Sequence, residues 1–258
     1  MKVLLAGGAG RVGSFVAPYL RRHHELRVLD LQPPRYGDVE YVEGSVTDPD
    51  ALRRALDSVD TFVWLVMRRG QGGSVPNQDV PTIVDNYEVN TKGLHLLLFT
   101  AQGLGVKSGV YTSTMSVHYR KRDWYSGEEL VPLDTPSVYG LTKGFGELIC
   151  QYFARWFDMN LIALRITGPR EREQWLEERR HPRVYQDGTP SGSKLCVTDE
   201  EDLAGAYLRA LDAAQVGHGR FDAVFIAGDE REQEHNLSKA RRLLGWQPRA
   251  HRLLEETD

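Results

Sequence analysis

The stretch Val3-Leu4-Leu5-Ala6-Gly7-Gly8-Ala9-Gly10-Arg11-Val12-Gly13 decides the fold of this chain. A short apolar run meets a glycine-rich turn, and a segment with apolar residues on one helical stripe follows, which is the pattern of strand, turn and helix. The glycines satisfy both G-x-G-x-x-G and G-x-x-G-x-x-G. Glycine permits a tight turn and lets backbone N–H groups approach a pyrophosphate, and the N-terminus of the next helix adds positive partial charge. The stretch therefore predicts a dinucleotide-binding turn.

A carboxylate stands where such a site needs one. Asp30 ends the next predicted strand, 20 positions after Gly10. An acid at this distance hydrogen-bonds the ribose hydroxyls of adenosine and repels the 2′-phosphate of NADP. We therefore expect NAD as the cofactor; the alternative, a plain strand–helix turn with a surface aspartate, leaves these coincidences unexplained.

Composition excludes several classes of partner. The 258 residues carry a net charge of −4, with acids and bases interspersed, so no nucleic-acid footprint is expected. Cys150 and Cys196 have neither metal-ligand nor redox spacing, and no metal site is expected. The first apolar run meets glycine too early for a signal peptide, and no apolar stretch approaches the roughly 20 residues that span a bilayer. We expect a cytoplasmic protein with no membrane partner.

Strand and helix alternate through residue 166, which predicts an α/β Rossmann fold with a doubly wound parallel sheet and helices on both faces. The predicted strands are 2–6, 26–30, 39–43, 60–67, 108–113 and 160–166, and the predicted helices are 11–22, 48–58, 80–103 and 137–157. Beyond residue 166 we expect a turn at 167–169, a charged segment at 170–183, a helix at 198–213, a strand at 221–226 and a helix at 238–244. The chain should therefore divide into an NAD-binding domain, 1–166, and a small, trimmed C-terminal substrate lobe, 167–258, interleaved with the sheet.

Tyr139 and Lys143 are the strongest candidates for chemistry. They lie four residues apart near the start of a predicted helix and so share one face. They follow the predicted strand that ends in the hydroxyl-rich run 112–114. An ammonium close to a phenol lowers the pKa of the phenol, so tyrosine can act as an acid or base near neutral pH. A neighbouring hydroxyl can hold the oxygen of the substrate.

At this point the chain resembles the extended short-chain dehydrogenase/reductases, also called the NAD-dependent epimerase/dehydratase family. The matching motifs span nearly the whole chain: Gly7-x-x-Gly10-x-x-Gly13, Asp30, Asn90-x-x-Gly93, 112–116, Tyr139-Gly-x-x-Lys143, Leu164-Arg165, Gly168-Pro169 and Leu243-Leu244-Gly245-Trp246-x-Pro248. The resemblance implies an oxidoreductase or epimerase that moves a hydride between NAD and a sugar-type alcohol or ketone. The alternative is an NAD-binding sensor or structural protein without turnover.

The resemblance also implies the residues of the site. The catalytic set is Thr114, Tyr139 and Lys143, with Ser113 and Ser116 open as alternatives to Thr114. The cofactor set is Gly7, Gly10, Arg11, Val12, Gly13, Asp30, Leu31, Ser45, Val46, Leu65, Val66, Met67, Asn90, Thr112, Tyr139, Lys143 and Ile166. The substrate set is Arg68, Met115, Ser116 and Arg170.

For several residues, a purely structural role explains the pattern as well as a role in binding a ligand does. Arg68 and Arg170 suit a carboxylate or phosphate, but the alternating charges of 170–183 are also typical of a solvated surface. Arg165 suits an ion pair as well as a ligand contact. His118 is expected to be a surface histidine rather than a substrate contact.

Departures from the family pattern favour a small substrate. Pro169 and Val197 lie only 28 positions apart, which leaves little surface for a nucleotide diphosphate. The run Lys143-Gly-Phe-Gly-Glu147 is similar to uronate dehydrogenases, a short branch that oxidises free sugar acids. A dehydratase is disfavoured, because Met115-Ser116 replaces the Asp-Glu pair of that subgroup.

The helix at 137–157 is apolar on more than one face, so a single sheet cannot bury it all. We therefore expect a homodimer through the 80–103 and 137–157 helices, as the family resemblance also implies.

Overall fold

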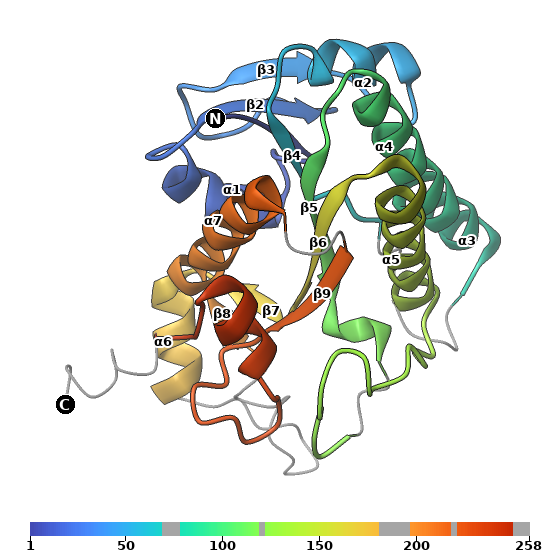
Figure 1. The fold of residues 1–258 in the computed structure, drawn as a ribbon. Helices are drawn as coiled ribbons and strands as arrows, with labels where there is room; N and C mark the ends of the chain where they lie inside the picture. The colour runs from blue at the N-terminus through green and yellow to red at the C-terminus, as the bar shows by residue number, and fades with distance from the viewer. Residues whose placement is uncertain (69–77, 119–121, 181–196, 218–220, 250–258) are drawn as a thin grey trace.

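The computed structural model describes residues 1–68, 78–118, 122–180, 197–217 and 221–249. Within them, seven parallel strands form one sheet in the order β3-β2-β1-β4-β5-β6-β9 (Figure 1). The strands are β1 Lys2–Ala6, β2 Glu25–Asp30, β3 Glu40–Glu43, β4 Thr61–Trp64, β5 Ser108–Thr114, β6 Asn160–Ile166 and β9 Phe221–Ile226. The predicted doubly wound α/β sheet is confirmed. Because all strands are parallel, their carboxyl ends meet at one edge, where such sheets bind ligands.

Helices cover both faces of the sheet (Figure 1). Helices α1 Arg11–Leu20 and α7 Glu200–Val216 pack together on one face, and α2 Pro49–Leu56, α4 Leu94–Gly103 and α5 Val138–Phe157 lie on the other. Each layer encloses its own cluster of fully buried aliphatic and aromatic side chains. Burial on both faces explains why the central strands are continuously apolar.

Side-chain caps define where the helices begin. The Asp48 carboxylate accepts from Asp50 N at 2.9 Å at the start of α2, and the Ser137 hydroxyl accepts from Gly140 N at 3.0 Å at the start of α5. Asp158, in the left-handed conformation with φ 57°, ends α5. These short polar side chains satisfy backbone groups that the helix itself leaves unpaired.

Several local predictions were wrong in detail. The predicted helix 80–103 is interrupted, with α3 Val80–Asn86, a π-helical segment η2 Tyr87–Gly93, and then α4. Strand β4 ends at Trp64, three residues earlier than predicted, although Leu65 N still donates to the carbonyl of Ala6 at 2.8 Å. Residues 197–199 form strand β8, Val197–Asp199, rather than a helix start. Asp199 then caps α7 by accepting from Glu201 N at 2.9 Å.

The chain after residue 166 returns to the main sheet. A two-stranded parallel ribbon joins β8 to β7, Gly168–Arg170, where a turn was predicted, and α6, Arg172–Arg180, follows. Strand β9 pairs with β6 along its whole length. The π-helical segment η5, Ala240–Leu244, packs near α7. The division at residue 166 stays a prediction.

Within the described ranges, no helix combines the length and apolarity needed to cross a bilayer. The same residues contain no group of three or more His, Cys, Asp or Glu side chains placed to hold a metal ion.

Candidate active site

The glycine turn between β1 and α1 has no room for side chains. Gly7 has φ +81°, and a Cβ there would lie 2.8 Å from Val66 N. A Cβ on Gly13 would lie 2.0 Å from the carbonyl oxygen of Gly8. These contacts keep the backbone of the turn bare, and beside it lies the N-terminus of α1, where the first backbone N–H groups of a helix have no partner within the helix. Such a cradle fits a pyrophosphate.

Asp30 is fixed against this turn. Its Oδ2 accepts from Ala9 N at 3.0 Å and its Oδ1 accepts from Leu31 N at 2.7 Å. The Tyr36 hydroxyl donates to the carbonyl of Gly8 at 2.7 Å. Burial, together with the nearby Asp30 charge, raises the pKa of the Tyr36 phenol, which therefore keeps its proton and its role as a donor. The predicted ribose-binding carboxylate and the predicted phosphate turn thus form one rigid unit.

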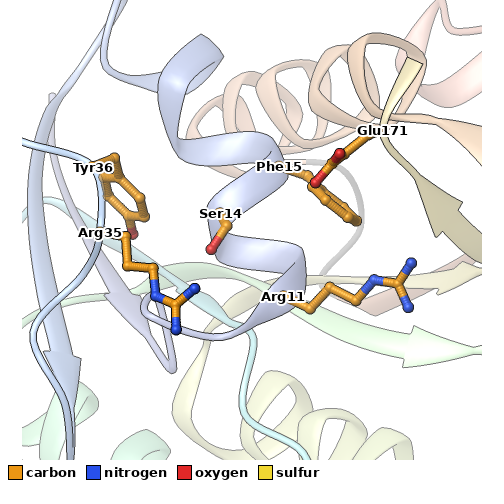
Figure 2. A pocket seen from close by; sticks show the side chains of 6 residues that line it. All are labelled: Arg11, Ser14, Phe15, Arg35, Tyr36 and Glu171. Atoms are coloured by element: carbon orange, nitrogen blue, oxygen red, sulfur yellow. The ribbon is translucent and has the colours of Figure 1, made fainter. Parts of the chain in front are cut away.

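A pocket of about 430 Å³ opens beside the first turn of α1. Figure 2 shows Arg11 and Arg35 on either side of Ser14, with Glu171 approaching from the chain after β7. The side chains of Arg11 and Arg35 are exposed. Two guanidinium groups beside a helix N-terminus suit a phosphate-bearing ligand.

The remaining predicted cofactor residues follow the carboxyl ends of successive strands. Leu31 follows β2, Ser45 and Val46 follow β3, Leu65, Val66 and Met67 follow β4, and Ile166 ends β6, while Thr112 lies near the end of β5. The parallel register brings these positions to one edge of the sheet. Thr112 differs from the other positions, because its side chain is buried and its hydroxyl lies 2.7 Å from the Tyr207 hydroxyl of α7.

Asn90 is fully buried in η2. Its Oδ1 accepts from Arg68 N at 2.8 Å, and its Nδ2 donates to Arg68 O at 3.1 Å. It also donates to the Thr142 hydroxyl of α5 at 3.1 Å. Asn90 therefore clamps the backbone after β4 to the helix that carries Tyr139 and Lys143. The π-helical turn is a common feature of functional sites, and here it presents this amide.

Lys143 is the most deeply buried cation on α5, with 1% of its surface exposed. Its Nζ donates to the carbonyls of Thr112 at 2.8 Å and Val66 at 3.1 Å. Its Nζ also lies 5.0 Å from the centroid of the Tyr111 ring. Burial lowers the pKa of Lys143 to about 7, although the Cys150 and Glu147 groups oppose the shift. The ammonium is therefore held at the junction of β4, β5 and α5, poised to lose its proton near neutral pH.

Tyr139 precedes Lys143 by one helical turn and is partly exposed. Its hydroxyl lies 3.8 Å from the Sδ atom of Met67, three residues after the end of β4. The start of α5 packs closely on the end of β5, because a Cβ on Gly140 would lie 2.2 Å from the carbonyl oxygen of Ser116. Thr114, the last residue of β5, accepts from Ser116 N at 3.0 Å. The segment that carries the predicted third catalytic hydroxyl thus lies against the helix turn that carries Tyr139.

A buried ion pair lies one turn beyond Lys143. Arg165 of β6 donates to Glu147 of α5 through Nε at 2.9 Å and Nη2 at 2.7 Å, and the Ser113 hydroxyl donates to the same carboxylate at 2.6 Å. Of the two interpretations of Arg165, the structure shows the ion pair. The expectation of a surface His118 was wrong. The ring is fully buried, and its Nδ1 lies 2.8 Å from the carbonyl of Pro132.

The predicted substrate residues lie around this site with different surroundings. Arg68 is exposed, and Met115 and Ser116 belong to the short 3₁₀ turn after β5. Arg170 pairs with Glu178 of α6 at 2.9 Å and donates to its neighbour's carbonyl. Residues 69–77, 119–121 and 181–196, the last of which include the end of the charged segment predicted at 170–183, lie outside the described residues.

The sequence profile of the NAD dependent epimerase/dehydratase family matches residues 3–187 of this chain, which is more than half of it. The chain belongs to this family. The glycine cradle that a Cβ would fill, with Asp30 tied to it, is what a bound NAD of this epimerase/dehydratase fold requires.

Two curated relatives illustrate the range of the family. A 3 beta-hydroxysteroid dehydrogenase/Delta 5→4-isomerase of Mycobacterium tuberculosis is 33% identical over 51% of this chain, a match that spans only 36% of that protein. An NAD-dependent glucose-6-phosphate dehydrogenase of Haloferax volcanii is 23% identical over 95% of this chain and 92% of its own length.

Solved structures share the same fold. A mutated uronate dehydrogenase superposes with a TM-score of 0.75 at 24% identity, covering 99% of this chain and 84% of that one. A UDP-glucose 4-epimerase from Brucella ovis in complex with NAD gives a TM-score of 0.77 at 19% identity, covering 96% and 93%.

Sequence reasoning missed the roles of three residues that shape this epimerase/dehydratase site. Tyr36 and Arg35 lie in the loop after β2. The proline and glycine residues of that loop indicated only a connection between strands, with no role in the site. Glu147 is the third, the buried partner of Arg165, for which an ion pair was one of the two interpretations. The signal for the pair was available, since a charged residue on the apolar face of α5 and another within the apolar run of β6 each need a buried partner.

Proposed function

We propose that this chain transfers a hydride between NAD and an alcohol or ketone carbon of a sugar-type substrate, with Tyr139 as the acid/base. The observation that carries the proposal is the buried ammonium of Lys143, held by two backbone carbonyls one helical turn from Tyr139. NAD, when bound, supplies the ring that accepts or gives the hydride. The residues of the chain have to bind the cofactor, hold the substrate oxygen and move one proton.

Tyr139 moves that proton. In the oxidative direction its phenolate oxygen takes the proton of the substrate hydroxyl, and in the reductive direction the phenol returns it. The ammonium of Lys143 stabilises the phenolate because an opposite charge nearby favours the ionised form. The lowered pKa of Lys143 means that this support weakens as the pH rises above about 7 in the chain alone.

A hydroxyl at the end of β5 orients the substrate oxygen. Ser113 is a poor candidate, because its hydroxyl donates to the Glu147 carboxylate at 2.6 Å. Thr114 accepts from Ser116 N, which leaves its O–H to donate to a substrate oxygen. We therefore favour Thr114 as the third catalytic residue, with Ser116 as the neighbouring alternative.

The substrate we propose is a free sugar, sugar phosphate or sugar acid rather than a sugar nucleotide. The trimmed segment after β7 supports this choice, and so do relatives named NAD-dependent glucose-6-phosphate dehydrogenase, L-arabinose 1-dehydrogenase and uronate dehydrogenase. Relatives named UDP-glucose epimerase support the wider class of sugar chemistry. Arg68 is the exposed cation closest in sequence to Met67 and is our candidate for binding an acidic group of the substrate.

The first experiment measures the NAD content of the purified protein before and after extensive dialysis. A dehydrogenase should release NAD readily, rebind it, and reduce it with an aldose, aldose phosphate or uronate. NAD retained at about one per chain after dialysis would instead support an epimerase that regenerates its own cofactor, and sugar nucleotides would then be screened. A protein that binds NAD but turns over none of these compounds, with the Tyr139→Phe variant behaving identically, would favour the sensor alternative.

We further propose that two copies pair through α4 and α5. Their outward side includes large apolar side chains that solvent reaches, among them Phe99, Leu148, Tyr152 and Trp156, the last with 65% of its surface exposed. An apolar groove of about 410 Å³ runs between η2 and α5. A second copy offers the same apolar surface about a two-fold axis, and such isologous pairing buries both faces at once.

The oligomeric state tests this pairing. Trp156→Glu should convert a dimer to a monomer in sedimentation at micromolar concentration, because it places a charge within the buried patch. Val216→Glu is the matched control, since Val216 is 85% exposed on α7 of the opposite layer. A wild-type monomer at this concentration would refute the dimer.

A further inference from the structure

The buried pair Glu147–Arg165 is placed to serve the residues that carry chemistry rather than the core alone. Glu147 follows Lys143 by one helical turn, and the side chains of the pair are 1% and 5% exposed. The Ser113 hydroxyl, which donates to Glu147, belongs to the residue directly before Thr114. Arg165 directly precedes Ile166, which ends β6. Three elements of the site therefore meet at one carboxylate.

The pair is fully satisfied by directional hydrogen bonds. Besides its two bonds to Glu147, Arg165 donates through Nη1 to the carbonyl of Glu128 at 2.9 Å. The same nitrogen lies 3.2 Å from His118 Nε2. Because His118 Nδ1 faces the carbonyl of Pro132, Nδ1 carries the ring proton and Nε2 accepts from Arg165. Burying two charges costs more than an apolar pair of similar volume, so an ion pair retained here is better explained by specificity than by stability.

We propose that Glu147 and Arg165 are positioning residues of the catalytic site, which lock α5 to the end of β5 and cancel each other's charge beside Lys143. The proposal rests on the proposed role of Lys143. Removal of either partner leaves the other charge uncompensated next to the ammonium, so the two single losses have opposite electrostatic effects. Simultaneous removal restores a neutral surrounding.

Three of the other groups around Lys143 do not supply this charge. Those of the described residues that face Lys143 or the pair are Tyr111, Cys150, His118, Glu128 and Tyr139. Burial raises the pKa of the Tyr111 phenol and of the Cys150 thiol, and lowers the pKa of His118 to about 4, so these three are neutral near pH 7. Burial also raises the pKa of Glu128, whose Oε1 accepts from Phe225 N at 2.7 Å.

The test follows the protonation of Lys143 directly. The Cε signal of Lys143 is followed by NMR against pH in the lysine-labelled full chain without cofactor, and the signal is assigned by its loss in Lys143→Met. Glu147→Gln should lower the titration midpoint of Lys143 by about half a pH unit or more, and Arg165→Met should raise it by a similar amount. The double variant should return to the wild-type midpoint.

Two further variants separate charge from shape. Arg165→Lys keeps the cation and should leave the midpoint close to wild type, although it loses the two-pronged contact with Glu147. Glu40→Gln changes the net charge equally at the far edge strand, where Glu40 pairs with Lys2 and Arg27, and should leave the midpoint unchanged.

Midpoints that stay unchanged, or that move in the same direction in both single variants, would overturn the positioning role. If Arg165→Met fails to fold, Glu147→Gln and the double variant still test the proposal. It predicts a lower titration midpoint of Lys143 in Glu147→Gln and the wild-type midpoint in the double variant. Failure of the proposed function is recognised separately, since Tyr139→Phe would then keep full turnover whatever the midpoint of Lys143.

Discussion

The glycine turn and the start of α5 build the site in opposite ways. At the turn, function depends on missing side chains, since Gly7 and Gly13 have backbone atoms where a Cβ would be. At α5, function depends on side chains whose partners come from other strands, as when Lys143 donates to carbonyls of β5 and of the segment after β4. The comparison teaches that the cofactor half of the site depends on backbone that approaches too closely for a side chain, from Gly8 at Gly13 and from Val66 at Gly7, whereas the catalytic half depends on long-range contacts of side chains.

The largest expected effect lies in the catalytic half. Tyr139→Phe should reduce turnover by about 10²–10⁴-fold and leave NAD affinity nearly unchanged, because it removes only the proton donor and acceptor. The measurement is steady-state kinetics on the substrate found in the screen, beside NAD titration. Tyr152→Phe, an exposed tyrosine of the same helix, is the matched control. Unchanged turnover in Tyr139→Phe would remove the basis for the mechanism.

A side chain added to the glycine turn should disrupt both the fold and NAD binding, because it collides with backbone atoms. Gly13→Ala should destabilise the fold by about 3 kcal/mol or more and abolish NAD binding, because the new Cβ meets the carbonyl of Gly8 at 2.0 Å. Gly103→Ala, at the end of α4 with open space around the Cβ position, should be neutral or slightly stabilising. Denaturant unfolding and NAD titration compare the two variants. If Gly13→Ala bound NAD normally, the cradle would not be the binding element.

Lys143 gives the catalytic half a characteristic pH dependence of stability. Its pKa is about 7 in the folded chain against an ordinary value of 10.5, so the folded state binds fewer protons between these values. The free energy of unfolding of the wild type, relative to Lys143→Met, should therefore rise as the pH increases from about 7 toward 10.5 and stay level below about 7. Lys92→Met, which removes a lysine from an exposed ion pair with Glu88, is the matched control. A flat difference for Lys143→Met would contradict the lowered pKa.

The smallest expected effect concerns the choice of cofactor. Asp30→Asn should weaken NAD binding about tenfold and narrow the preference for NAD over NADP, because the carboxylate charge that repels a 2′-phosphate is lost. Calorimetric titration with both dinucleotides measures this preference. Glu25→Gln removes the same charge at the exposed start of β2, the opposite end of the strand that Asp30 ends, and should leave the preference for NAD unchanged. Tighter binding of NADP by the wild type would refute the role of Asp30.

Much of the fold was predictable because its signals are local. The alternation of apolar strands and amphipathic helices predicted the parallel sheet, and the glycine spacing predicted the turn. The errors occurred where partners distant in sequence decide the structure. Val197–Asp199 pairs with Gly168–Arg170 to become a strand, which no pattern within residues 197–199 indicates. Tertiary pairing overrides propensity in such short segments.

The same distinction, between local signals and partners distant in sequence, applies to the candidate site. The family motifs named Tyr139, Lys143 and Asn90, but not what surrounds them. Asn90 was predicted close to the cofactor, and the structure shows that its amide holds the Arg68 backbone and Thr142. His118 was expected at the surface, and the packing of β5, β6 and the loop before α5 buries it against Arg165. Burial of a polar residue depends on which distant group can satisfy it, and a single sequence does not record that pairing.

By itself, the sequence determined the layered α/β architecture, the bare glycine turn and the residue types that could carry hydride chemistry, because helix and strand periodicity and the conformational freedom of glycine act over a few neighbouring residues. Only the tertiary structure decided that Lys143 lies between two carbonyls, that Glu147 finds Arg165, and that the end of β4 is clamped by Asn90. These contacts join residues 18 to 77 positions apart, and their energies come from burial and hydrogen-bond partners that exist only once the sheet has assembled.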